Sequence, residues 1–524
     1  MITAAGRLSG AITTHIARAT IRACVCVTAS KLLKKERYMK RYRFCINCFT
    51  AVVLFASLFT FGFQAVSAET SANAASDLMY GDINADGKIN SADLSALKRY
   101  ILELAPLPGD SKAADLNGDR LTNSSDLSLL KRYILGLITV FPVSGNNQPA
   151  ATKWVGTWAA SQQLVESSNM PPSPGLSGST LRQVVRVSIG GNKLRLNFSN
   201  EYGTSPVTLN SVHFAESAGA GSIKSGTDKV LTFGGKESVT IPAGKIVTSD
   251  TFDYNLTQMT NMAATIYFGS TSTALTGHPG SRTTSYILSG NKVDSLSMTS
   301  AATTAHWYIV SGIDVFVDDS YKAAVALGDS ITDGRGSTTD GNDRWTDDLA
   351  LRLLGNTTTS KVAVLNHGIG GNAVLSGGLG PTTVTRFDRD VLGQSGVRYG
   401  MILDGVNDIG SSSSTQVATD LINAFKTFIS KAHQKNILVY GMTILPFGGS
   451  QYDSAVHEQA RQTVNNWIKT SGSFDAVIDL EAAMQDPSNK TKLLSAYDSG
   501  DHLHPNAEGY KKMAAMIDLT LFTK

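Results

Sequence analysis

The chain has 524 residues, of which 42% are hydrophobic and 17% charged. It is therefore long enough for about three domains and carries enough apolar residues for more than one core. Ten of the 46 Lys/Arg residues but only one of the 43 Asp/Glu residues lie in the first 68 positions, so the formal charge of +3 becomes −6 beyond them, with 36 basic and 42 acidic residues. This balance excludes the basic footprint of a nucleic-acid-binding protein.

The first 68 residues have the pattern of an export signal. Met39–Arg43 is basic, Phe44–Phe63 is almost wholly apolar, and Val66–Ala68 offers small residues at the cleavage positions. We therefore predict a start at Met39, export, and cleavage after Ala68. An uncleaved anchor is the alternative, because the apolar run is close to membrane-spanning length. Residues 1–38 are then either translated sequence upstream of the start or an unusually long basic segment.

All four cysteines lie in this leader, at Cys24, Cys26, Cys45 and Cys48. The mature protein is therefore expected to have no disulfides. An exported protein of this kind must rely on large cores, on bound metal, or on both.

Residues 77–140 contain an internal repeat at an offset of 33 residues: Asp82–Asp93 is matched by Asp115–Asp126, and a similar helical segment follows each loop. Oxygen-bearing side chains recur at loop positions 1, 3, 5, 9 and 12, which with the carbonyl of position 7 provide the hard ligands that Ca²⁺ requires. Two polar turns that merely precede helices would not explain this recurrence. The predicted ligands are Asp82, Asn84, Asp86, Lys88 (carbonyl), Asn90 and Asp93, and Asp115, Asn117, Asp119, Leu121 (carbonyl), Asn123 and Asp126.

The two loops depart from the EF-hand template. Position 12 is Asp rather than Glu, and Gly87 at position 6 of the first loop becomes Arg120 in the second. Because position 6 needs Gly for a sharp turn, the second loop is expected to bind Ca²⁺ more weakly or to bend at Gly118. So small a helical module has little core of its own, which gives it a physical reason to need metal.

With these motifs the region resembles a type I dockerin, the module that docks bacterial cell-wall-degrading enzymes onto cohesin domains of a scaffold protein. The resemblance implies a small α-helical module with two structural Ca²⁺ ions and a cohesin partner. It also implies two near-equivalent cohesin-facing surfaces, formed by Ser91, Ala92, Lys98 and Arg99, and by Ser124, Ser125, Lys131 and Arg132.

A polar linker predicted at 141–151 leads to a β-rich domain predicted at 152–320. Apolar residues alternate over 185–189 and 194–198 around a Gly-Gly-Asn turn, which predicts a hairpin. Further short strands are expected at 230–233, 238–241, 263–268, 306–310 and 313–317. Short, regularly spaced strands without long helical patterns indicate a β-sandwich.

The tryptophans of this domain have two interpretations. Trp154, Trp158 and Trp307 could stack on sugar rings, but aromatic residues in strands more often pack in a core, and we favour packing. The segment Ser167–Ser177 is rich in Pro, Ser and Gly and has the composition of a loop that could border a neighbouring site.

From residue 321 to 524, strands and helices alternate. Strands are expected at 323–327, 362–365, 401–403, 437–444 and 476–480, and helices near 344–354, 383–392, 415–434, 454–469 and 506–520. Such alternation implies a parallel sheet with helices on both faces. The predicted fold is a three-layer α/β domain of flavodoxin-like type with a five-stranded parallel sheet.

Chemically active residues follow the ends of these strands, where open α/β sheets bind ligands. Ser330 follows the first strand, a glycine-rich turn containing Gly371 follows the second, and Asn407 follows the third. Asp501 and His504 lie before the final helix, three residues apart, so the carboxylate can hold imidazole Nδ1–H while Nε2 takes the proton of Ser330. This arrangement predicts acyl transfer.

Four ordered blocks, namely Gly328-Asp-Ser-Ile, the glycine of the second turn, Gly405-Val-Asn-Asp and Asp501-His-Leu-His-Pro, resemble the SGNH (GDSL) hydrolase superfamily across residues 321–524. The Trp-Val-Gly-Thr-Trp strand extends the likeness upstream, because a similar β-domain precedes the catalytic domain in one bacterial branch. The resemblance implies Ser330 as nucleophile and His504 as general base and acid, oriented by Asp501. It implies an oxyanion site formed by the backbone N–H groups of Ser330 and Gly371 and the side chain of Asn407.

Other histidines and aspartates lie near the predicted site in the sequence, and we expect them to have structural rather than catalytic roles. His502 has no acidic residue three positions before it, so His504 is preferred, and His367 is expected to border the pocket without a chemical role. Asp329 is expected to brace its turn by bonding to the backbone. Solvated loops are expected for Asp333, Asp340 and Asp343.

The combined expectation is a secreted, scaffold-docked carbohydrate esterase that removes acetyl groups from plant cell-wall polysaccharide such as xylan, without a catalytic cofactor. A broad-specificity lipase or acyl-thioesterase is an alternative from the same chemistry. A protein that chiefly binds polysaccharide through residues 150–320 is an alternative from a different class. The expected partners are a cohesin domain and acylated polysaccharide, with neither nucleic acid nor, after cleavage, a membrane.

Overall fold

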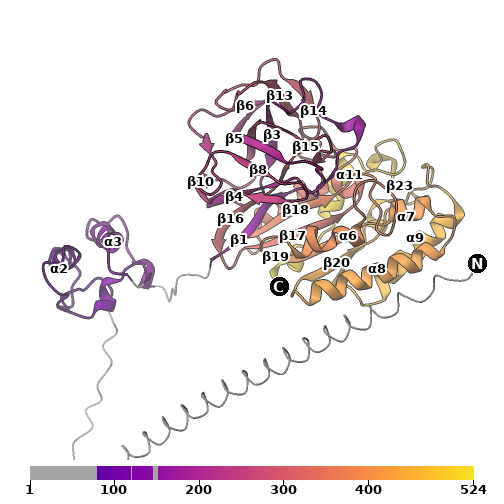
Figure 1. Ribbon diagram of the computed structural model, residues 1–524. Helices are drawn as coiled ribbons and strands as arrows, with labels where there is room; N and C mark the ends of the chain where they lie inside the picture. The colour runs from indigo at the N-terminus through magenta and orange to yellow at the C-terminus, as the bar shows by residue number, and fades with distance from the viewer. Residues whose placement is uncertain (1–78, 120, 145–151) are drawn as a thin grey trace, which may run out of the picture. The chain divides into compact units, whose positions relative to one another are not determined.

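A computed structural model describes residues 79–119, 121–144 and 152–524 (Figure 1). The predictions for the leader (a start at Met39, cleavage after Ala68 and the four cysteines) fall outside the described residues, as do Arg120 and most of the predicted linker. Within these described ranges, no helix is both long enough and apolar enough to span a bilayer.

Residues 80–144 form two loop-and-helix units that match in structure as they do in sequence. Helices α2 (Ser91–Ile101) and α3 (Ser124–Ile134) occupy equivalent positions, and each begins at an Asn/Asp capping box. These caps satisfy N–H groups that would otherwise lack partners at the helix N-termini. Two 3₁₀ turns, η1 (Ser111–Ala114) and η2 (Pro142–Ser144), complete the module.

The core of this module is small. Its buried apolar side chains are Ile83, Leu97, Ala114, Leu116, Leu130 and Phe141. Phe141, at the first position of the predicted linker, stacks on Tyr133 with ring centroids 4.6 Å apart. A Cβ at Gly81 would lie 2.5 Å from the Phe141 ring, so this close approach requires glycine. The packed module therefore includes the beginning of the segment predicted as linker.

Residues 152–318 (the β region) form antiparallel sheets. The strands are β1 (Thr152–Ala159), β2 (Gln163–Leu164), β3 (Ser179–Arg186), β4 (Gly191–Ser199), β5 (Val207–Gly219), β6 (Ser222–Ile223), β7 (Lys229–Val230), β8 (Val239–Ile241), β9 (Ile246–Thr248), β10 (Phe252–Leu256), β11 (Asn261–Phe268), β12 (Thr276–His278), β13 (Ser285–Ser289), β14 (Ala302–Thr304), β15 (Trp307–Tyr308) and β16 (Val310–Asp318). One sheet runs β1-β16-β4-β10 with β9 beside β4, and a larger one runs β14-β13-β3-β11-β5-β6 with β7 and β8 beside β5. A small third sheet runs β15-β12-β2.

The hairpin predicted around residues 190–192 is wrong. β3 and β4 flank this turn, but β3 pairs with β11 and β13, whereas β4 pairs with β16, β10 and β9. Alternation reports that a strand has one buried face and does not identify the neighbour with which it pairs. A Cβ at Gly190 would lie 2.3 Å from the Leu256 carbonyl oxygen, so the chain turns here from one sheet into the other.

Two of the three tryptophans of the β region pack in its core, as favoured from the sequence, and Trp154 is half-buried. Trp158 and Trp307 are 7% and 6% exposed and meet edge to face with ring centroids 5.0 Å apart. Trp307 Nε1 donates to the Val184 carbonyl at 2.9 Å. The Trp154 ring is covered by the Arg195 guanidinium at 4.4 Å.

Residues 322–524 (the α/β region) are built on a sheet with the strand order β18-β17-β19-β20-β21, in which every neighbouring pair is parallel. The strands are β17 (Lys322–Gly328), β18 (Val362–Gly368), β19 (Val397–Leu403), β20 (Leu438–Met442) and β21 (Ala476–Ile478). The helices are α4 (Ser330–Asp333), α5 (Trp345–Leu354), α6 (Thr383–Phe387) with the π turn η4 (Asp388–Leu392), α7 (Val406–Ser411), α8 (Gln416–His433), α9 (Ala455–Thr470), α10 (Leu480–Met484) and α11 (Ala507–Ala515). This order makes the carboxyl ends of β18, β17 and β19 neighbours.

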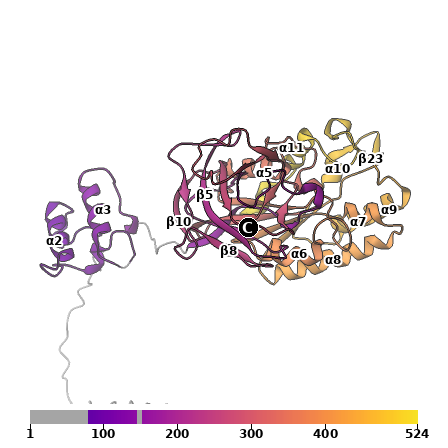
Figure 2. The ribbon, with the colours of Figure 1, turned by 45° about the horizontal axis from the view of Figure 1, so that its top comes forward.

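The β region and the α/β region share one continuous cluster of buried apolar side chains, from Val155 to Phe522. β1 lies against β18, and the Gly156 N–H donates to the Ser395 carbonyl at 2.9 Å. A Cβ at Gly156 would lie 2.8 Å from Leu365 Cδ1, so glycine permits this contact. Figures 1 and 2 show the β region against one side of the α/β region, with α8 and α9 on the far side.

Candidate active site

Ser330 is the first residue of α4, and only Asp329 separates it from the end of β17. Asp329 caps the helix, because its Oδ1 accepts the N–H of Ile331 at 2.9 Å, in agreement with its expected bracing of the turn. A Cβ at Gly328 would lie 2.2 Å from the Leu403 carbonyl oxygen on β19. The glycine thus allows the strand end to pack tightly beside β19 and directs the next residues to the sheet edge, where Ser330 lines a pocket.

The structure brings Ser330, His504 and Asp501 together. His504 Nε2 lies 2.8 Å from Ser330 Oγ, and His504 Nδ1 lies 2.7 Å from Asp501 Oδ2. The other oxygen of Asp501 accepts the backbone N–H groups of Leu503 and His504 at 3.0 and 2.9 Å. The carboxylate is therefore fixed in position by its own loop, and it sets the imidazole with Nε2 toward the hydroxyl.

Electrostatics keep the base neutral and its partner ionised. Burial lowers the pKa of His504 below 6.5, and the positive charges of Arg335 and Arg282 act in the same direction against the opposing effect of Asp501. Burial acts to raise the pKa of Asp501, but its hydrogen bonds with the His504 backbone and ring and the Leu503 N–H outweigh burial and lower that pKa to about 2. At neutral pH, His504 can therefore accept a proton beside an ionised Asp501.

The rate of ester hydrolysis is expected to fall only in acid, because protonation removes the base. Since the pKa of His504 lies below 6.5, the acid limb of a kcat/KM profile should have its midpoint below pH 6.5. Arg335→Gln removes a charge that lowers this pKa, so the limb should move to higher pH. A midpoint above pH 6.5 in the wild type, or a limb that does not move in the variant, would contradict this assignment.

The residues predicted to hold the oxyanion line the same pocket. Ser330, Gly371 and Asn407 are all among its walls, and Gly371 has φ +70°, a conformation that favours glycine. Asn407 Nδ2 donates to the Asn372 carbonyl at 2.8 Å, and Asn407 Oδ1 accepts the Tyr452 hydroxyl at 2.9 Å. The amide is thereby oriented, and its second N–H remains available for a ligand oxygen.

Replacing Asn407 by alanine is expected to lower kcat about 10²–10³-fold, or ~2.7–4 kcal/mol, because one preorganised donor is removed. Tyr452→Phe is the matched control: it leaves the amide in place and removes only the hydroxyl that orients Asn407, so its loss should be much smaller. Steady-state kinetics on an aryl acetate would measure both. A kcat for Asn407→Ala close to the wild-type value would remove Asn407 from the oxyanion site.

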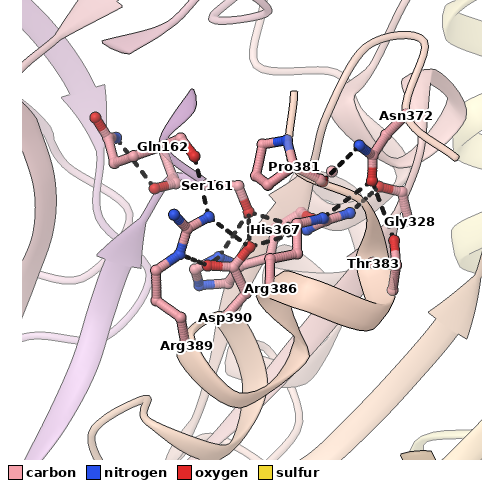
Figure 3. Close-up of polar contacts among 12 residues, drawn as sticks. Ser161, Gln162, Gly328, His367, Asn372, Pro381, Thr383, Arg386, Arg389 and Asp390 are labelled. Carbon is pink, nitrogen blue, oxygen red and sulfur yellow. Dashed lines mark hydrogen bonds and ion pairs between the residues drawn. The ribbon is translucent and has the colours of Figure 1, made fainter. Parts of the chain in front are cut away.

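Arg386 of α6 forms hydrogen bonds both to the strand end before Ser330 and to Asn372, next to Gly371 (Figure 3). Its Nη2 donates to the Gly328 carbonyl at 2.8 Å, and its Nε donates to Asn372 Oδ1 at 3.0 Å. The first bond fixes the strand end that leads to Ser330. The second fixes the residue whose carbonyl binds Asn407. The side chain is fully buried, so Arg386 is a positioning residue that no sequence motif indicated.

A buried ion pair links the same arginine to the β region (Figure 3). Arg386 Nη1 lies 3.0 Å from Asp390 Oδ2, which also accepts the Ser161 hydroxyl of the β region at 2.7 Å. Arg389 pairs with Asp390 at 2.6 Å and donates to the Gln162 carbonyl at 3.0 Å. The α/β region therefore contacts the β region through charged and hydrogen-bonded groups, and one of them, Arg386, also binds Gly328, two residues before Ser330.

His367 belongs to this buried contact, and the expectation that it borders the catalytic pocket is wrong. Its Nδ1 lies 3.0 Å from Ser161 Oγ. Burial and the nearby Arg386 and Arg389 charges outweigh Asp390 and lower the pKa of His367 to about 4. His367 lies on β18, on the side of the strand that faces the β region, whereas the pocket is formed by the turn that follows the strand.

Asp333 and Asp340 were both expected in solvated loops, and the structure contradicts this for Asp333 only. Asp333, expected in a solvated loop, is 2% exposed, because it ends α4 beneath β12. Its Oδ1 lies 2.9 Å from His278 Nε2, while His278 Nδ1 lies 2.8 Å from the Ser161 carbonyl. A carbonyl only accepts, so Nδ1 carries a hydrogen, and a second proton must lie between His278 and Asp333. Asp340 remains exposed, as expected.

His502 is not linked to Ser330. Its Nδ1 lies 2.5 Å from Asp498 Oδ2. This imidazole therefore does have a carboxylate partner, four residues earlier in the chain and not three. Its side chain is 55% exposed. Asp343, with its side chain bonded to the Thr338 N–H at 2.8 Å, stabilises a loop.

The catalytic pocket has a volume of about 560 Å³. The α/β region supplies Ser330, His504, Asp501, Gly371 and Asn407, and the β region supplies Gln163, Glu166, Asn169, Pro279, Gly280, Arg282 and His306. Asn169 lies in the loop that was expected to border a neighbouring site. The β region therefore forms one wall of the pocket.

The loops of the N-terminal repeat carry oxygen ligands suited to Ca²⁺. Asp93 and Asp126 are fully buried, and among the described residues neither pairs with a basic side chain. Asp93 accepts the N–H groups of Ile83 and Asn90 at 2.8 and 2.9 Å, and Asp126 accepts those of Leu116 and Asn123 at the same distances. Buried carboxylates without a protein cation fit a bound divalent ion.

The second loop was expected to compensate for its missing position 6 glycine by a bend at Gly118, which is position 4. Gly118 has φ +78°, but Ala85 at the equivalent position of the first loop also has a positive φ of 55°. The bend at position 4 is thus common to both loops. Gly87 has φ +80°, and Arg120, its counterpart, lies outside the described residues.

The eight predicted cohesin-facing residues are all exposed, at the start and in the last turns of α2 and α3. Exposed leucines follow both helices at equivalent positions: Leu102 and Leu104 are 55% and 67% exposed, and Leu135 and Leu137 are 61% and 67% exposed. Paired apolar and basic groups repeated on two helices form a surface suited to a protein partner.

One other set of possible metal ligands lies in the β region. Within the described ranges, His213, Asp228 and Asp294 are the one group of three acidic, His or Cys residues with ligand atoms within 4.8 Å of one another. His213 Nδ1 is 2.6 Å from Asp228, but Nε2 is 3.9 Å from Asp294. A histidine flanked by carboxylates accounts for this arrangement without a metal.

Comparisons with known proteins identify two families. Residues 326–512 match the GDSL-like lipase/acylhydrolase family, and residues 80–135 match the dockerin type I domain. Endoglucanase D of Acetivibrio thermocellus is 49% identical over 41 residues, which cover 8% of this chain and 6% of that enzyme.

Solved structures resemble the two parts separately. A member of the lipolytic G-D-S-L family from Veillonella parvula is 19% identical, with 39% of this chain and 99% of that one covered and a TM-score of 0.29. The acetyl xylan esterase AlAXEase is 20% identical, with 37% and 96% covered and a TM-score of 0.29. A chain in a type I cohesin–dockerin complex from Clostridium thermocellum is 43% identical, with 12% and 96% covered and a TM-score of 0.12.

Proposed function

We propose that this chain, which contains a GDSL-like lipase/acylhydrolase domain and a type I dockerin domain, is an extracellular serine esterase docked on a cohesin-bearing scaffold. Its proposed substrate is acetylated plant cell-wall polysaccharide such as xylan. The observation that carries the enzymatic part is the continuous hydrogen-bonded series from Ser330 through His504 to Asp501, with distances of 2.8 and 2.7 Å.

The geometry supports a two-step acyl transfer. Ser330 Oγ attacks the ester carbonyl while His504 Nε2 takes its proton, and the N–H groups of Ser330, Gly371 and Asn407 hold the developing oxyanion. The intermediate then collapses with cleavage of the bond to the sugar oxygen, to which His504 gives the proton, so that the sugar leaves with a free hydroxyl and the acyl group stays on Ser330. A water molecule, deprotonated by His504, attacks this acyl-enzyme, and the acid is released with Ser330 restored.

The finer fold assignments belong to the same proposal. A flavodoxin-like, three-layer catalytic domain is supported by the parallel strand order β18-β17-β19-β20-β21. A β-sandwich is supported by the two larger antiparallel sheets of the β region, whose apolar residues belong to one core. In this proposal, the domains span 77–140, extended to Ser144 by the packing of Phe141 and by η2, then 152–320 and 321–524.

The polysaccharide substrate is inferred from the other domain found in the same chain, which is an argument by association. A dockerin match accompanies the hydrolase match in one chain, and a relative that matches 41 residues of the chain is named an endoglucanase. The export signal predicted from the sequence, with cleavage after Ala68, supports an extracellular location.

Acetate release tests the substrate. The purified protein should release acetate from acetylated xylan, and among aryl esters its kcat/KM should fall as the acyl chain lengthens beyond acetyl. Increasing activity toward long acyl chains, with no acetate released from polysaccharide, would favour a lipase or acyl-thioesterase. Polysaccharide binding by the intact protein with no turnover of any ester would favour a binding module.

Calcium removal tests the docking part. The double change Asp82→Ala/Asp115→Ala is expected to weaken cohesin capture by about 100-fold or more, because ligand charge tunes calcium affinity over several orders of magnitude. The matched control is Asp110→Ala, an exposed aspartate of the same module that caps η1 and is not a loop ligand. Capture of a type I cohesin, measured with Ca²⁺ and with EDTA, that is unchanged in the double variant would contradict the calcium assignment.

A further inference from the structure

Arg282 occupies an unusual position in the catalytic pocket. It lies in the loop between β12 and β13 and lines the pocket that contains Ser330 and His504. Its backbone has φ +51°, a conformation that costs free energy for any residue other than glycine and that often marks a functional position.

The surroundings impose this conformation. The Asp340 N–H donates to the Arg282 carbonyl at 2.9 Å, and the Asp340 carboxylate accepts both the N–H and the hydroxyl of Thr284 at 2.7 Å. Arg344 donates to the Ser281 carbonyl. Residues of the α/β region therefore fix the loop on both sides of Arg282 and hold its side chain at the pocket wall.

The guanidinium of Arg282 lacks a partner in the part of the chain that the structure describes. Its Nε is buried without a hydrogen bond, and no ion pair or side-chain hydrogen bond joins it to another described residue. The side chain is half-buried, and its guanidinium keeps its charge and offers five donors. A guanidinium that lines a pocket without a partner among the described residues is available to bind a ligand.

Within the described residues, no ion pair or hydrogen bond joins an acid of the pocket to the Arg282 side chain. Both oxygens of Glu166 accept amide groups, from Gln163 and Asn169 at 2.5 and 3.0 Å. Asp501 is bound to His504, and Asp333 is bound to His278 through one oxygen, while its other oxygen has no partner. A second arginine, Arg335, lines the pocket with its side chain 61% exposed, and its Nε lies 3.9 Å from Asp501 Oδ2. Among the described residues of the pocket, Arg282 is therefore the arginine that no carboxylate of the protein contacts.

We propose that Arg282 binds a carboxylate of the substrate close to the scissile ester, so that esters on acidic sugars such as uronic acids are hydrolysed in preference to neutral ones. This inference rests on the proposed esterase function and names its substrate class. A planar guanidinium matches a carboxylate through paired N–H···O bonds. The carboxylate can stand on the sugar or on the acyl group, and the test below separates the two.

Hydrolysis should be compared on two matched substrate pairs. Acetylated pectin with methyl-esterified carboxyl groups and the same pectin after enzymatic demethylation differ only in sugar charge. 4-Nitrophenyl butyrate and 4-nitrophenyl hemisuccinate differ by a carboxylate on the acyl group. In at least one pair, the wild type should prefer the charged member, and Arg282→Gln should lower that kcat/KM ratio about tenfold, or 1.4 kcal/mol. Arg282→Lys should retain part of the preference.

The ratio within a pair corrects for any general loss of active protein. Arg335→Gln is the matched control, because it removes an exposed positive charge from the same pocket and should change the ratio much less. A wild type without preference in either pair, or equal losses of preference in the two glutamine variants, would overturn the assignment to Arg282.

Binding distinguishes this inference from the esterase proposal. Calorimetry with trigalacturonate and the Ser330→Ala variant needs no turnover, and adding Arg282→Gln should weaken the Kd about tenfold if the carboxylate stands on the sugar. Arg282-dependent binding by a protein that hydrolyses no ester would retain the acidic ligand and reject the esterase. Ser330-dependent hydrolysis without Arg282-dependent preference or binding would retain the esterase and reject the acidic substrate.

Discussion

Replacing Ser330 by alanine is expected to abolish ester hydrolysis, with kcat lowered about 10⁴–10⁶-fold. The change removes the nucleophile and with it the acyl-enzyme route. The oxyanion donors remain, but they can stabilise only a direct attack by water. Stability should change little, since one buried hydrogen bond is worth about 1 kcal/mol. Steady-state hydrolysis of an aryl acetate and a thermal unfolding curve would measure both effects.

Ser337→Ala is the matched control for this prediction. Ser337 lies in the loop after α4 and donates to the Gly334 carbonyl at 2.6 Å, and it is not a wall of the catalytic pocket. Its variant should hydrolyse the ester at a rate close to that of the wild type. If Ser330→Ala kept a substantial fraction of the wild-type kcat while folded, Ser330 could not be the nucleophile.

Replacing Arg386 by methionine is expected to lower the free energy of unfolding by ~3–5 kcal/mol, the range for breaking a buried charged network from one side. Five acceptors lose a donor: Gly328 O, His367 O, Asn372 Oδ1, Asp390 and Ser161 Oγ, at 2.7–3.2 Å. The bonds to Gly328 and Asn372 position the strand end before Ser330 and the residues of the oxyanion site, so kcat should fall as well. Denaturant unfolding and aryl acetate kinetics would test this.

Arg389→Met separates the two roles of this network. Arg389 shares Asp390 with Arg386 and reaches the Gln162 carbonyl and the Tyr202 hydroxyl of the β region, but it does not touch Gly328 or Asn372. We expect a smaller loss of stability, because its side chain is 23% exposed, and little effect on kcat. Equal losses of kcat in the two variants would argue against a positioning role for Arg386.

The buried acid next to this network should respond to the same substitution. Burial raises the pKa of Asp404 to about 7, and Arg386 opposes that rise. The Thr383 hydroxyl holds this carboxyl group at 2.7 Å. Loss of the Arg386 charge would favour the protonated form further, which would limit the cost of the substitution.

Local patterns predicted which residues the structure brings together at the candidate active site, because most of those residues lie where strands end. The positions of Ser330, Asn407, Asp501 and His504 follow from alternating strands and helices together with short-range spacing, and the strand order of the sheet brings the first two to one edge. The dockerin-like loops were predictable for a similar reason, since ligands, caps and helices repeat within one short segment.

Long-range partners were not predictable in this way. Arg386 binds Gly328, 58 residues earlier, and Ser161, 225 residues earlier, and no periodicity records such pairings. The strand β5, from Val207 to Gly219, was missed because its polar residues interrupt the alternation. The false hairpin at residues 190–192 has the same origin, because strand pairing in a protein with several sheets is decided by tertiary packing.

The role of the β region also required the structure. Sequence composition offered only a loop and three tryptophans as possible contacts with a ligand. The tryptophans are structural, whereas Arg282, Glu166 and His306 line the catalytic pocket. These are hydrophilic residues in loops or at strand ends and belong to no sequence motif. Only their position in the pocket that contains Ser330 indicates a possible contact with the ligand.

The central claim, an acyl-enzyme formed on Ser330, can be tested most directly by rapid quenching and mass spectrometry. The wild-type protein should be mixed with an activated aryl acetate, quenched in acid within the first turnovers, digested and mapped. The account predicts an acetyl group on the peptide that contains Ser330 in the wild type and none on that peptide in Ser330→Ala. An acetyl group formed during turnover on another residue, or rapid turnover in which Ser330 is never acetylated, would contradict it.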